Sequence, residues 1–174
     1  MKNSKIFKMN FFKLPVAWAA ICCFIFTNIT QAQDAVKNYS DSLLLQIRQA
    51  PTTDLKIEAL LNVSNFWIDY DTIKAKQYLE EAYELMDKPA TDFQKGLYHL
   101  YRANIWMDFE PEKAKSEYQS ADRLLANEET LKAYLYRSRL WNNYGVILQK
   151  EDKSAEFMEV IVNKTIPFAR KSGD

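Results

Sequence analysis

Residues 65–86 read NFWIDYDTIKAKQYLEEAYELM, and residues 104–125 read NIWMDFEPEKAKSEYQSADRLL. The two stretches align without a gap at a spacing of 39 residues. Eight positions are identical: Asn65/Asn104, Trp67/Trp106, Asp69/Asp108, Lys74/Lys113, Ala75/Ala114, Lys76/Lys115, Ala82/Ala121 and Leu85/Leu124. Self-similarity at such a fixed spacing indicates stacked supersecondary units. Because repeat arrays usually bind other molecules and rarely catalyse reactions, the repeat predicts a binding function without identifying what is bound.

Residues 1–32 have the features of a secretory signal peptide in the expected order. Four lysines and no acidic residue precede an apolar run at residues 14–26, and Thr30-Gln31-Ala32 offers small residues for cleavage. The run is shorter than the about 18 residues of a spanning helix. We therefore expect export to the periplasm or another extracytoplasmic location, with cleavage after Ala32. An uncleaved membrane anchor is the alternative.

Cleavage at that point would remove both cysteines of the chain, Cys22 and Cys23. The mature chain would then have no disulfide, no thiolate nucleophile and no cysteine-based metal site. Lipid attachment is disfavoured, because it needs a small residue before the cysteine and Ile21 precedes Cys22.

The composition of residues 33–174 is weakly acidic, with 19 basic and 23 acidic side chains and a net charge of −4. A nucleic-acid partner would need a clustered basic face, so we expect none. Glycine is scarce while Ala, Leu, Glu and Lys are common, which favours an all-helical chain.

Apolar spacing and capping residues predict about seven helices after the signal peptide. Asp71, a capping box of Thr91 with Gln94, and Pro111 mark three helix starts, and Pro167 should kink or split the last helix. The expected helices lie at about residues 40–49, 53 or 54 to 67, 71–87, 91–109, 111 to before 127, 127 or 128 to 148, and 153–171.

Very short turns within the last six of these helices predict three antiparallel pairs, because short turns keep sequence neighbours together in space. The expected fold class is therefore all-α, a right-handed α-solenoid of antiparallel helix pairs. We expect it to form one domain at residues 33–174, with repeats at about 55–88, 93–127 and 131–172.

The pattern resembles the tetratricopeptide repeat (TPR) family, which places large apolar, small and aromatic residues on its first helix and two alanines seven apart on its second. The first unit matches with Leu60, Val63, Ser64, Trp67, Ala75, Leu79 and Ala82. The second matches with Ala103, Trp106, Ala114, Tyr118 and Ala121, and the third with Trp141, Tyr144, Gly145, Leu148, Ala155 and Val162. The spacing exceeds the family's usual period of about 34, so HEAT-like or other helical-pair solenoids are alternatives.

A signal peptide followed at once by helical pairs resembles the extracytoplasmic sensor regions of bacterial membrane-bound histidine kinases and helix-turn-helix regulators. The resemblance implies a spanning helix and an output domain beyond residue 174. The chain is then the sensory N-terminal part of a larger signalling protein and binds a protein or peptide. Membrane contact is expected only through that missing region or an uncleaved signal anchor, and self-association through the uncapped C-terminal helix. A free-standing periplasmic scaffold or assembly factor is the first alternative, and an enzyme with an unrecognised site is the second.

No motif indicates catalysis, a cofactor or a metal. The one histidine, His99, takes the place of Leu60 in the repeat and is expected to serve packing. Asp69 and Asp108 lie at equivalent helix ends and are expected to solvate turns. Equivalent residues of stacked helices lie about 10 Å apart, too far for an acid/base pair. The tryptophans are expected to anchor the core.

A peptide groove is the one binding site that the sequence predicts. Asn65 and Asn104 resemble the TPR family's groove-lining asparagine, but Leu61 and Leu100 stand where carboxylate-gripping members have a lysine. An apolar groove with polar handles would suit an amphipathic or extended segment. The predicted groove residues are Leu61, Asn65, Ile68, Asp69, Leu100, Asn104, Met107 and Asp108.

Overall fold

A computed structural model describes residues 34, 36–86 and 90–173. Every regular element within these residues is a helix, which confirms the all-α class. Residues 42–174 form one compact unit, and residues 1–41 belong to a separate one. The expected signal peptide at residues 1–32 lies outside the described residues. In the part that is described, no helix is both long and apolar enough to cross a membrane.

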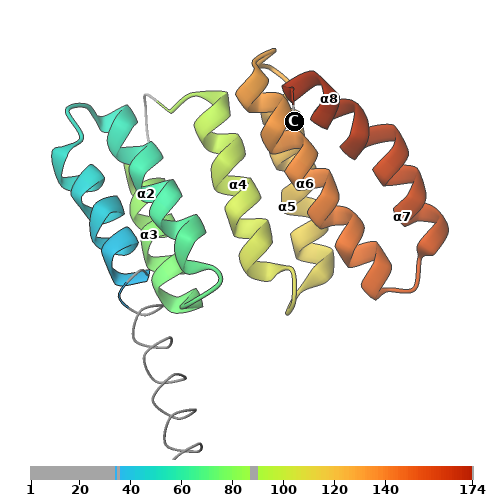
Figure 1. The fold of residues 1–174 in the computed structure, drawn as a ribbon, viewed down its shortest axis with the longest axis horizontal. Coiled ribbons are helices and arrows are strands. Elements are labelled where there is room, and N and C mark those ends of the chain that lie inside the picture. The colour runs from blue at the N-terminus through green and yellow to red at the C-terminus, as the bar shows by residue number, and fades with distance from the viewer. Residues whose placement is uncertain (1–33, 35, 87–89, 174) are drawn as a thin grey trace, which may run out of the picture. The chain divides into compact units, whose positions relative to one another are not determined.

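The helices follow one another with short connections (Figure 1). Residues 36–49 are helical and precede the labelled elements. The labelled elements are α2 (Thr53–Trp67), α3 (Thr72–Leu85), α4 (Asp92–Trp106), α5 (Pro111–Leu125), α6 (Leu131–Lys150), α7 (Ser154–Val160), η2 (Ile161–Thr165) and α8 (Ile166–Ser172).

Three helix starts confirm the capping predictions. The Asp71 carboxylate accepts hydrogen bonds from two backbone N–H groups at the start of α3. Thr91 and Gln94 form the expected capping box of α4, and Pro111 begins α5. These contacts satisfy N–H groups that have no partner inside the helix, so local sequence is enough to place them.

Of the other two starts, α2 begins at Thr53 as predicted, and α6 begins later than predicted. Thr52 caps α2 through its side chain. Thr130 caps α6 by accepting a 3.1 Å hydrogen bond from the N–H of Ala133, whereas Asn127 or Glu128 was the expected start. The Asn127 side chain is engaged elsewhere, because its amide donates a 2.7 Å hydrogen bond to Asp92.

Pro167 splits the last helical segment, as the sequence predicts. The π-helical turn η2 separates α7 from α8, and Pro167 lies in the first turn of α8. Proline lacks an N–H and crowds the carbonyl four residues earlier, and a wider turn at this point relieves that conflict.

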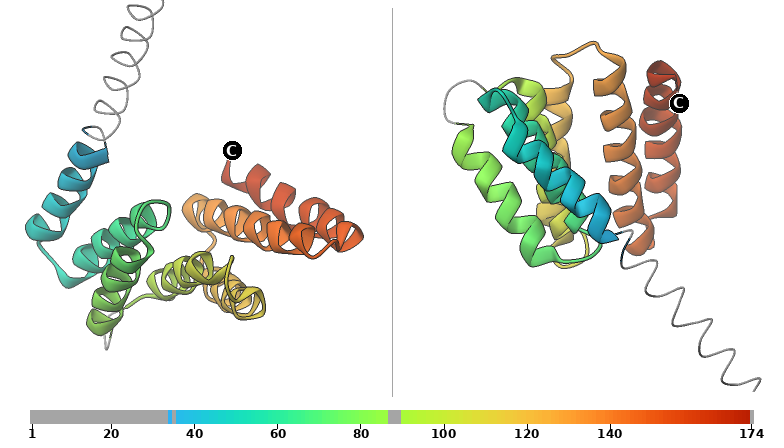
Figure 2. Two further views of the ribbon diagram at one scale, coloured as in Figure 1. Left: turned by 90° about the horizontal axis from the view of Figure 1, so that it is seen from below. Right: turned by 60° about the vertical axis from the view of Figure 1, so that its left-hand side comes forward.

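Consecutive helices pack in pairs along residues 53–172. Helix α2 packs on α3, α4 on α5, and α6 on the segment from α7 to α8. Contacts from α3 to α4 and from α5 to α6 join one pair to the next. Figure 2 shows α6 and the α7–α8 segment side by side in both of its views. One continuous core runs through these contacts.

Small residues lie where the helices of the first two pairs meet. Ala75 and Ala82 of α3 and their counterparts Ala114 and Ala121 of α5 are fully buried. Gly96 allows α4 to approach α5, because a Cβ atom there would lie 2.8 Å from Cγ of Leu125. The repeated alanines are therefore packing residues, as expected for helices in close contact.

The third pair does not follow the same register. Ala155 and Val162 were expected to take the place of the buried alanines, but both are exposed. Gly145 faces Phe157 instead, and a Cβ atom at Gly145 would lie 3.1 Å from that ring. A large aromatic side chain thus fills the space that alanines occupy in the earlier pairs.

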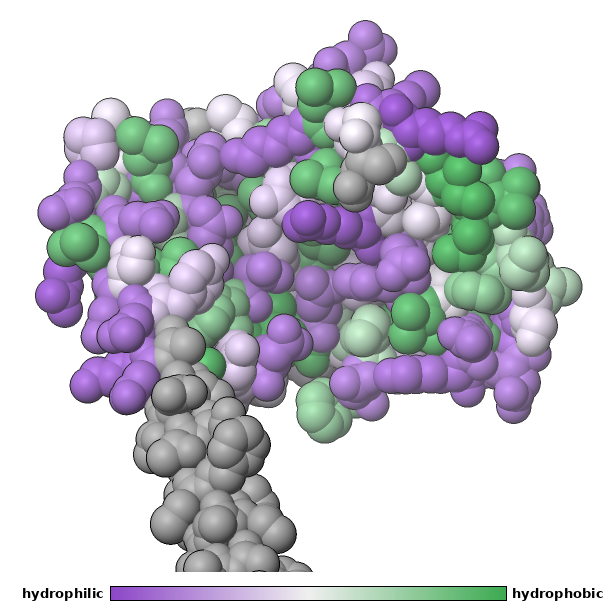
Figure 3. Space-filling view, viewed as in Figure 1, coloured by the Kyte–Doolittle hydropathy of each residue, from purple (hydrophilic) through white to green (hydrophobic). Residues whose placement is uncertain are grey.

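An exposed apolar strip runs along the last segment. Figure 3 shows hydrophobic side chains gathered over the α7–α8 edge of residues 42–174. Met158, Val162 and Ile166 are each at least 40% exposed and follow one another at helical spacing. In the first two pairs the second helix is covered by the first helix of the next pair.

Candidate functional site

The predicted peptide groove is only partly accessible. Leu61 is fully buried and Leu100 is 2% exposed, so both belong to the core and do not face a ligand. Ile68 and Met107 are half-buried and pack against the same core. Asn65 and Asp69 are exposed. The surface that remains open is therefore the C-terminal end of α2 around Asn65, Ile68 and Asp69.

Asn104 is occupied by contacts within the chain. Its side-chain oxygen accepts a 2.7 Å hydrogen bond from the Tyr118 hydroxyl and a 3.0 Å hydrogen bond from the Asn143 amide. Burial raises the pKa of Tyr118, so its hydroxyl stays a proton donor. Asn104 and Asn143 lie one repeat apart, and their hydrogen bond joins α4 to α6. A peptide would have to displace this pairing to use Asn104.

The two repeated aspartates have different surroundings. Asp108 forms an exposed 2.5 Å ion pair with Lys150 of α6. Asp69 makes no hydrogen bond or ion pair with the described residues, so it is the freer of the two. Neither carboxylate bonds a turn N–H within the described residues, so the expected solvation of turns is not observed as a direct contact.

The repeated tryptophans and lysines form equivalent contacts. The Lys74 ammonium lies 4.1 Å from the centre of the Trp67 ring, and Lys113 lies 3.5 Å from that of Trp106. A cation over an indole face is an attractive arrangement. The identical positions of the repeat thus carry identical contacts in two successive units.

The second lysine of each Lys-Ala-Lys sequence reaches toward the next unit. Lys76 lies 5.1 Å from the centre of the Trp106 ring. Lys115 donates 3.0 and 3.1 Å hydrogen bonds to Glu151, just after α6, and also pairs with Glu112. Hydrogen bonds from Lys153 and Lys115 lower the pKa of Glu151. The repeated lysines therefore connect neighbouring helix pairs.

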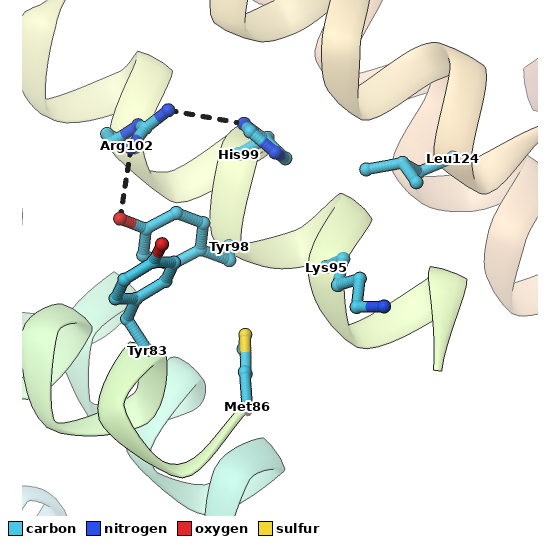
Figure 4. A pocket seen from close by; sticks show the side chains of 7 residues that line it. All are labelled: Tyr83, Met86, Lys95, Tyr98, His99, Arg102 and Leu124. Atoms are coloured by element: carbon cyan, nitrogen blue, oxygen red, sulfur yellow. Dashed lines mark hydrogen bonds between the residues drawn. The ribbon is translucent and has the colours of Figure 1, made fainter. Parts of the chain in front are cut away.

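A pocket of about 420 Å³ lies where α3 and α5 flank α4 (Figure 4). Helices α3 and α5 do not contact each other, which leaves the face of α4 between them open. We call it the α3–α4–α5 pocket. Its lining residues are Tyr83, Met86, Lys95, Tyr98, His99, Arg102 and Leu124.

One side of this pocket is a network of charged and polar groups. Arg102 donates a 2.6 Å hydrogen bond to Glu117 and a 3.0 Å hydrogen bond to the Tyr98 hydroxyl. Nδ1 of His99 lies 2.7 Å from the same carboxylate, within hydrogen-bonding distance. Burial lowers the pKa of Arg102, but the bond to Glu117 and the proximity of Tyr98 outweigh that effect and raise it. The guanidinium therefore stays charged.

Aromatic rings and a second cationic side chain also line the pocket. The Tyr83 and Tyr98 rings stack with centroids 5.0 Å apart. Tyr83 is 55% exposed, so its ring is available at the pocket mouth. Lys95 is exposed and has no ion-pair partner among residues 36–86 and 90–173. The pocket therefore offers an aromatic wall and a lysine ammonium that no described residue pairs with.

Sequence reasoning missed this pocket, although a signal was present. Lys95, His99 and Arg102 follow one another at spacings of four and three, which places them on one face of a helix. Most of the other side chains in the middle of that helix are apolar, so a polar stripe there indicates a surface that is not packed by a neighbour. His99 was expected to serve packing, and it does contact Glu117 of the neighbouring helix, but it also lines the pocket.

No group of three His, Cys, Asp or Glu side chains in the described part of the chain is placed to hold a metal ion. Comparison with protein-family models, curated proteins and solved structures finds no match for this chain.

Proposed function

We propose that the chain is an exported TPR-like module that binds a protein or peptide and does no catalysis. In this proposal the helix pairs at residues 53–172 run antiparallel and stack into a right-handed α-solenoid. The observation that supports it best is the recurrence of the same contacts 39 residues apart. In each of the first two units a lysine ammonium lies over a tryptophan ring, Lys74 over Trp67 and Lys113 over Trp106. Chains built in this way expose extended surfaces that bind partners.

The binding surface that we propose is the exposed end of α2, around Asn65, Ile68 and Asp69. A partner segment could hydrogen-bond there to the Asn65 amide and the Asp69 carboxylate, and it could make an apolar contact with the half-buried Ile68. Leu61 and Leu100 are buried in the core and form no part of this surface. Asn104 and Asp108 extend it only if a partner competes with Asn143 and Lys150.

Site-specific photo-crosslinking tests this proposal. Benzoylphenylalanine would replace Asn65 or Asp69, with Gln77 on the exposed side of α3 as the matched control position. In the exporting cells, we expect one discrete adduct from positions 65 and 69 and none from 77. Failure to obtain an adduct at 65 and 69, or the same adduct from all three positions, would contradict the proposed surface.

The same adducts separate two versions of the proposal. In the first, the chain is the sensory N-terminal part of a larger signalling protein, and its adduct is with a soluble protein or peptide signal. In the second, it is a free-standing periplasmic scaffold, and its adduct is with a resident envelope component. An adduct between two copies through Met158 or Val162 would assign self-association to the α7–α8 strip, which is exposed.

A further inference from the structure

Successive helix pairs meet at two junctions, α3 with α4 and α5 with α6. The two junctions differ in which side chains cover the equivalent faces of α4 and α6. Tyr83 and Tyr98 meet at the first junction, and the residues 39 positions later, Asp122 and Arg137, meet at the second. An aromatic stack at one junction thus corresponds to a 2.7 Å ion pair at the other. Because the contacts are equivalent, the second junction is an internal reference for the first.

At the second junction, an aromatic ring of the chain itself covers the face of the first helix. Phe168 of α8 stacks on Tyr134, with ring centroids 6.3 Å apart and an interplanar angle of 15°. The Arg137 guanidinium lies 4.0 Å from the centre of the Phe168 ring. Tyr134 and Arg137 are the counterparts of Lys95 and Tyr98. An aromatic ring therefore occupies the position that the α3–α4–α5 pocket leaves open.

At the first junction, the α5 residue that lines the pocket is Leu124, a smaller side chain than Phe168, and a pocket of about 420 Å³ remains. That volume lies within the range of small-molecule sites. Figure 4 shows the stacked Tyr83 and Tyr98 rings on one side of the opening and Lys95 and Leu124 on the other. Tyr83, Met86 and Leu124 supply apolar contact, so the pocket suits a flat apolar body.

The charges around the pocket select the polar end of such a molecule. Glu117 is engaged by Arg102 and His99, so the charge of Arg102 is balanced. Lys95 has no such partner among the described residues, and its ammonium stays available at the rim. A carboxylate on the bound molecule would supply a counter-ion to this ammonium.

We propose that the α3–α4–α5 pocket binds a small aromatic carboxylate, with its ring against Tyr83 and Tyr98 and its carboxylate at Lys95. This site is separate from the surface proposed at the end of α2, since Asn65 and Asp69 do not line it. Binding here therefore stands or fails independently of the proposed protein-binding function.

Titration of the ¹⁵N-labelled protein with phenylacetate, followed by NMR, tests the site. We expect saturable shifts of the amide resonances at residues 83–86 and 95–102, and none of these with acetate. Phenylacetamide has nearly the same shape without the charge, and it should bind about threefold more weakly, as expected for an exposed ion pair. Equal affinity for phenylacetate and phenylacetamide, or no saturable shift at these residues, would overturn the proposal.

Matched variants tie the binding to the named residues. Lys95→Gln should reduce phenylacetate affinity to the level of phenylacetamide, whereas Lys56→Gln, at an exposed lysine of α2 away from the pocket, should leave it unchanged. Leu124→Trp should fill the pocket and abolish the shifts. Tyr83→Ala should weaken binding, and because this position is exposed it serves as the test if Leu124→Trp fails to fold. Unaltered binding by Lys95→Gln or Tyr83→Ala would contradict the assignment.

A short peptide distinguishes a free small molecule from the side chains of a protein partner as the group that the pocket binds. Acetyl-Phe-Asp-amide carries a ring and a nearby carboxylate within a polypeptide. Saturation by phenylacetate at lower concentration than by the peptide supports the proposal. Saturation by the peptide alone would overturn it and assign the pocket to a partner's side chains.

Discussion

The hydroxyl of Ser64 donates a 2.8 Å hydrogen bond to the carbonyl oxygen of Ala75, and both residues are fully buried. This contact fixes the approach of α2 to α3 in the first pair. Ala103 and Ala114 occupy the same two positions in the second pair. Both are fully buried, but alanine has no hydroxyl, so this hydrogen bond is not formed there. The close approach is therefore made by small side chains, and the hydrogen bond adds to it in one pair.

Ser64→Ala should lower the free energy of unfolding by about 0.5–1.5 kcal/mol, the usual net contribution of one buried hydrogen bond. Ser64→Val should cost more, about 1–3 kcal/mol, because two methyl groups would have to fit against Ala75. Urea unfolding followed by circular dichroism measures both. Ser116→Ala on the exposed side of α5 is the control. A valine variant as stable as the alanine variant would argue against close packing here.

Gly96→Ala should destabilise the protein although alanine favours helices. The added Cβ atom would lie 2.8 Å from Leu125, which is fully buried, and such overpacking costs about 1–3 kcal/mol. The gain in helix propensity is only about 1 kcal/mol. Thermal unfolding checks the sign, and a rise in melting temperature would show that α4 and α5 are not in this contact.

The Lys115–Glu151 ion pair should make stability depend on pH. Hydrogen bonds from Lys153 and Lys115 lower the pKa of Glu151 from its usual 4.5. The stabilisation by the Glu151 carboxylate is therefore complete above pH 4.5 and is lost as pH falls through the lowered pKa. Bonds to Glu112 and Glu151 outweigh the effect of burial and raise the pKa of Lys115, so its contribution is lost only as pH rises beyond 10.5.

Unfolding of the wild type and of Glu151→Gln at several pH values tests this dependence. The difference between them should be largest between pH 5 and pH 10 and should shrink as pH falls below 4.5. A difference that stays constant into acid would mean that the carboxylate charge plays no part.

Much of the fold could be predicted because its determinants are local or periodic. Asp71, Thr91 and Pro111 place helix starts through bonds to nearby backbone groups. Proline disrupts the interior of a helix, so the position of Pro167 in the last helical segment was enough to predict the break. The alanines of the first two pairs were predictable because the 39-residue repeat identifies their shared positions.

The rest depends on contacts that no local pattern reveals. The start of α6 shifts to Thr130 because Asn127 bonds to Asp92, 35 positions earlier. The third pair departs from the register because Phe157 packs on Gly145. Leu61 and Leu100 were assigned to a groove because the repeat cannot tell which face of a first helix its neighbours cover. The pocket arises from the separation of α3 and α5, which is a tertiary property.

The repeat register itself is tested most directly by placing one bulky residue at three positions that the sequence makes equivalent. Ala75→Trp and Ala114→Trp insert an indole at fully buried contacts, and Ala155→Trp inserts it at an exposed site. Calorimetry should show melting temperatures lowered by roughly 3–10 °C or more for the first two variants, or their failure to fold. The third should melt within about 2 °C of the wild type, as surface substitutions do. Wild-type melting for Ala75→Trp and Ala114→Trp, or an equal loss for Ala155→Trp, would contradict the account.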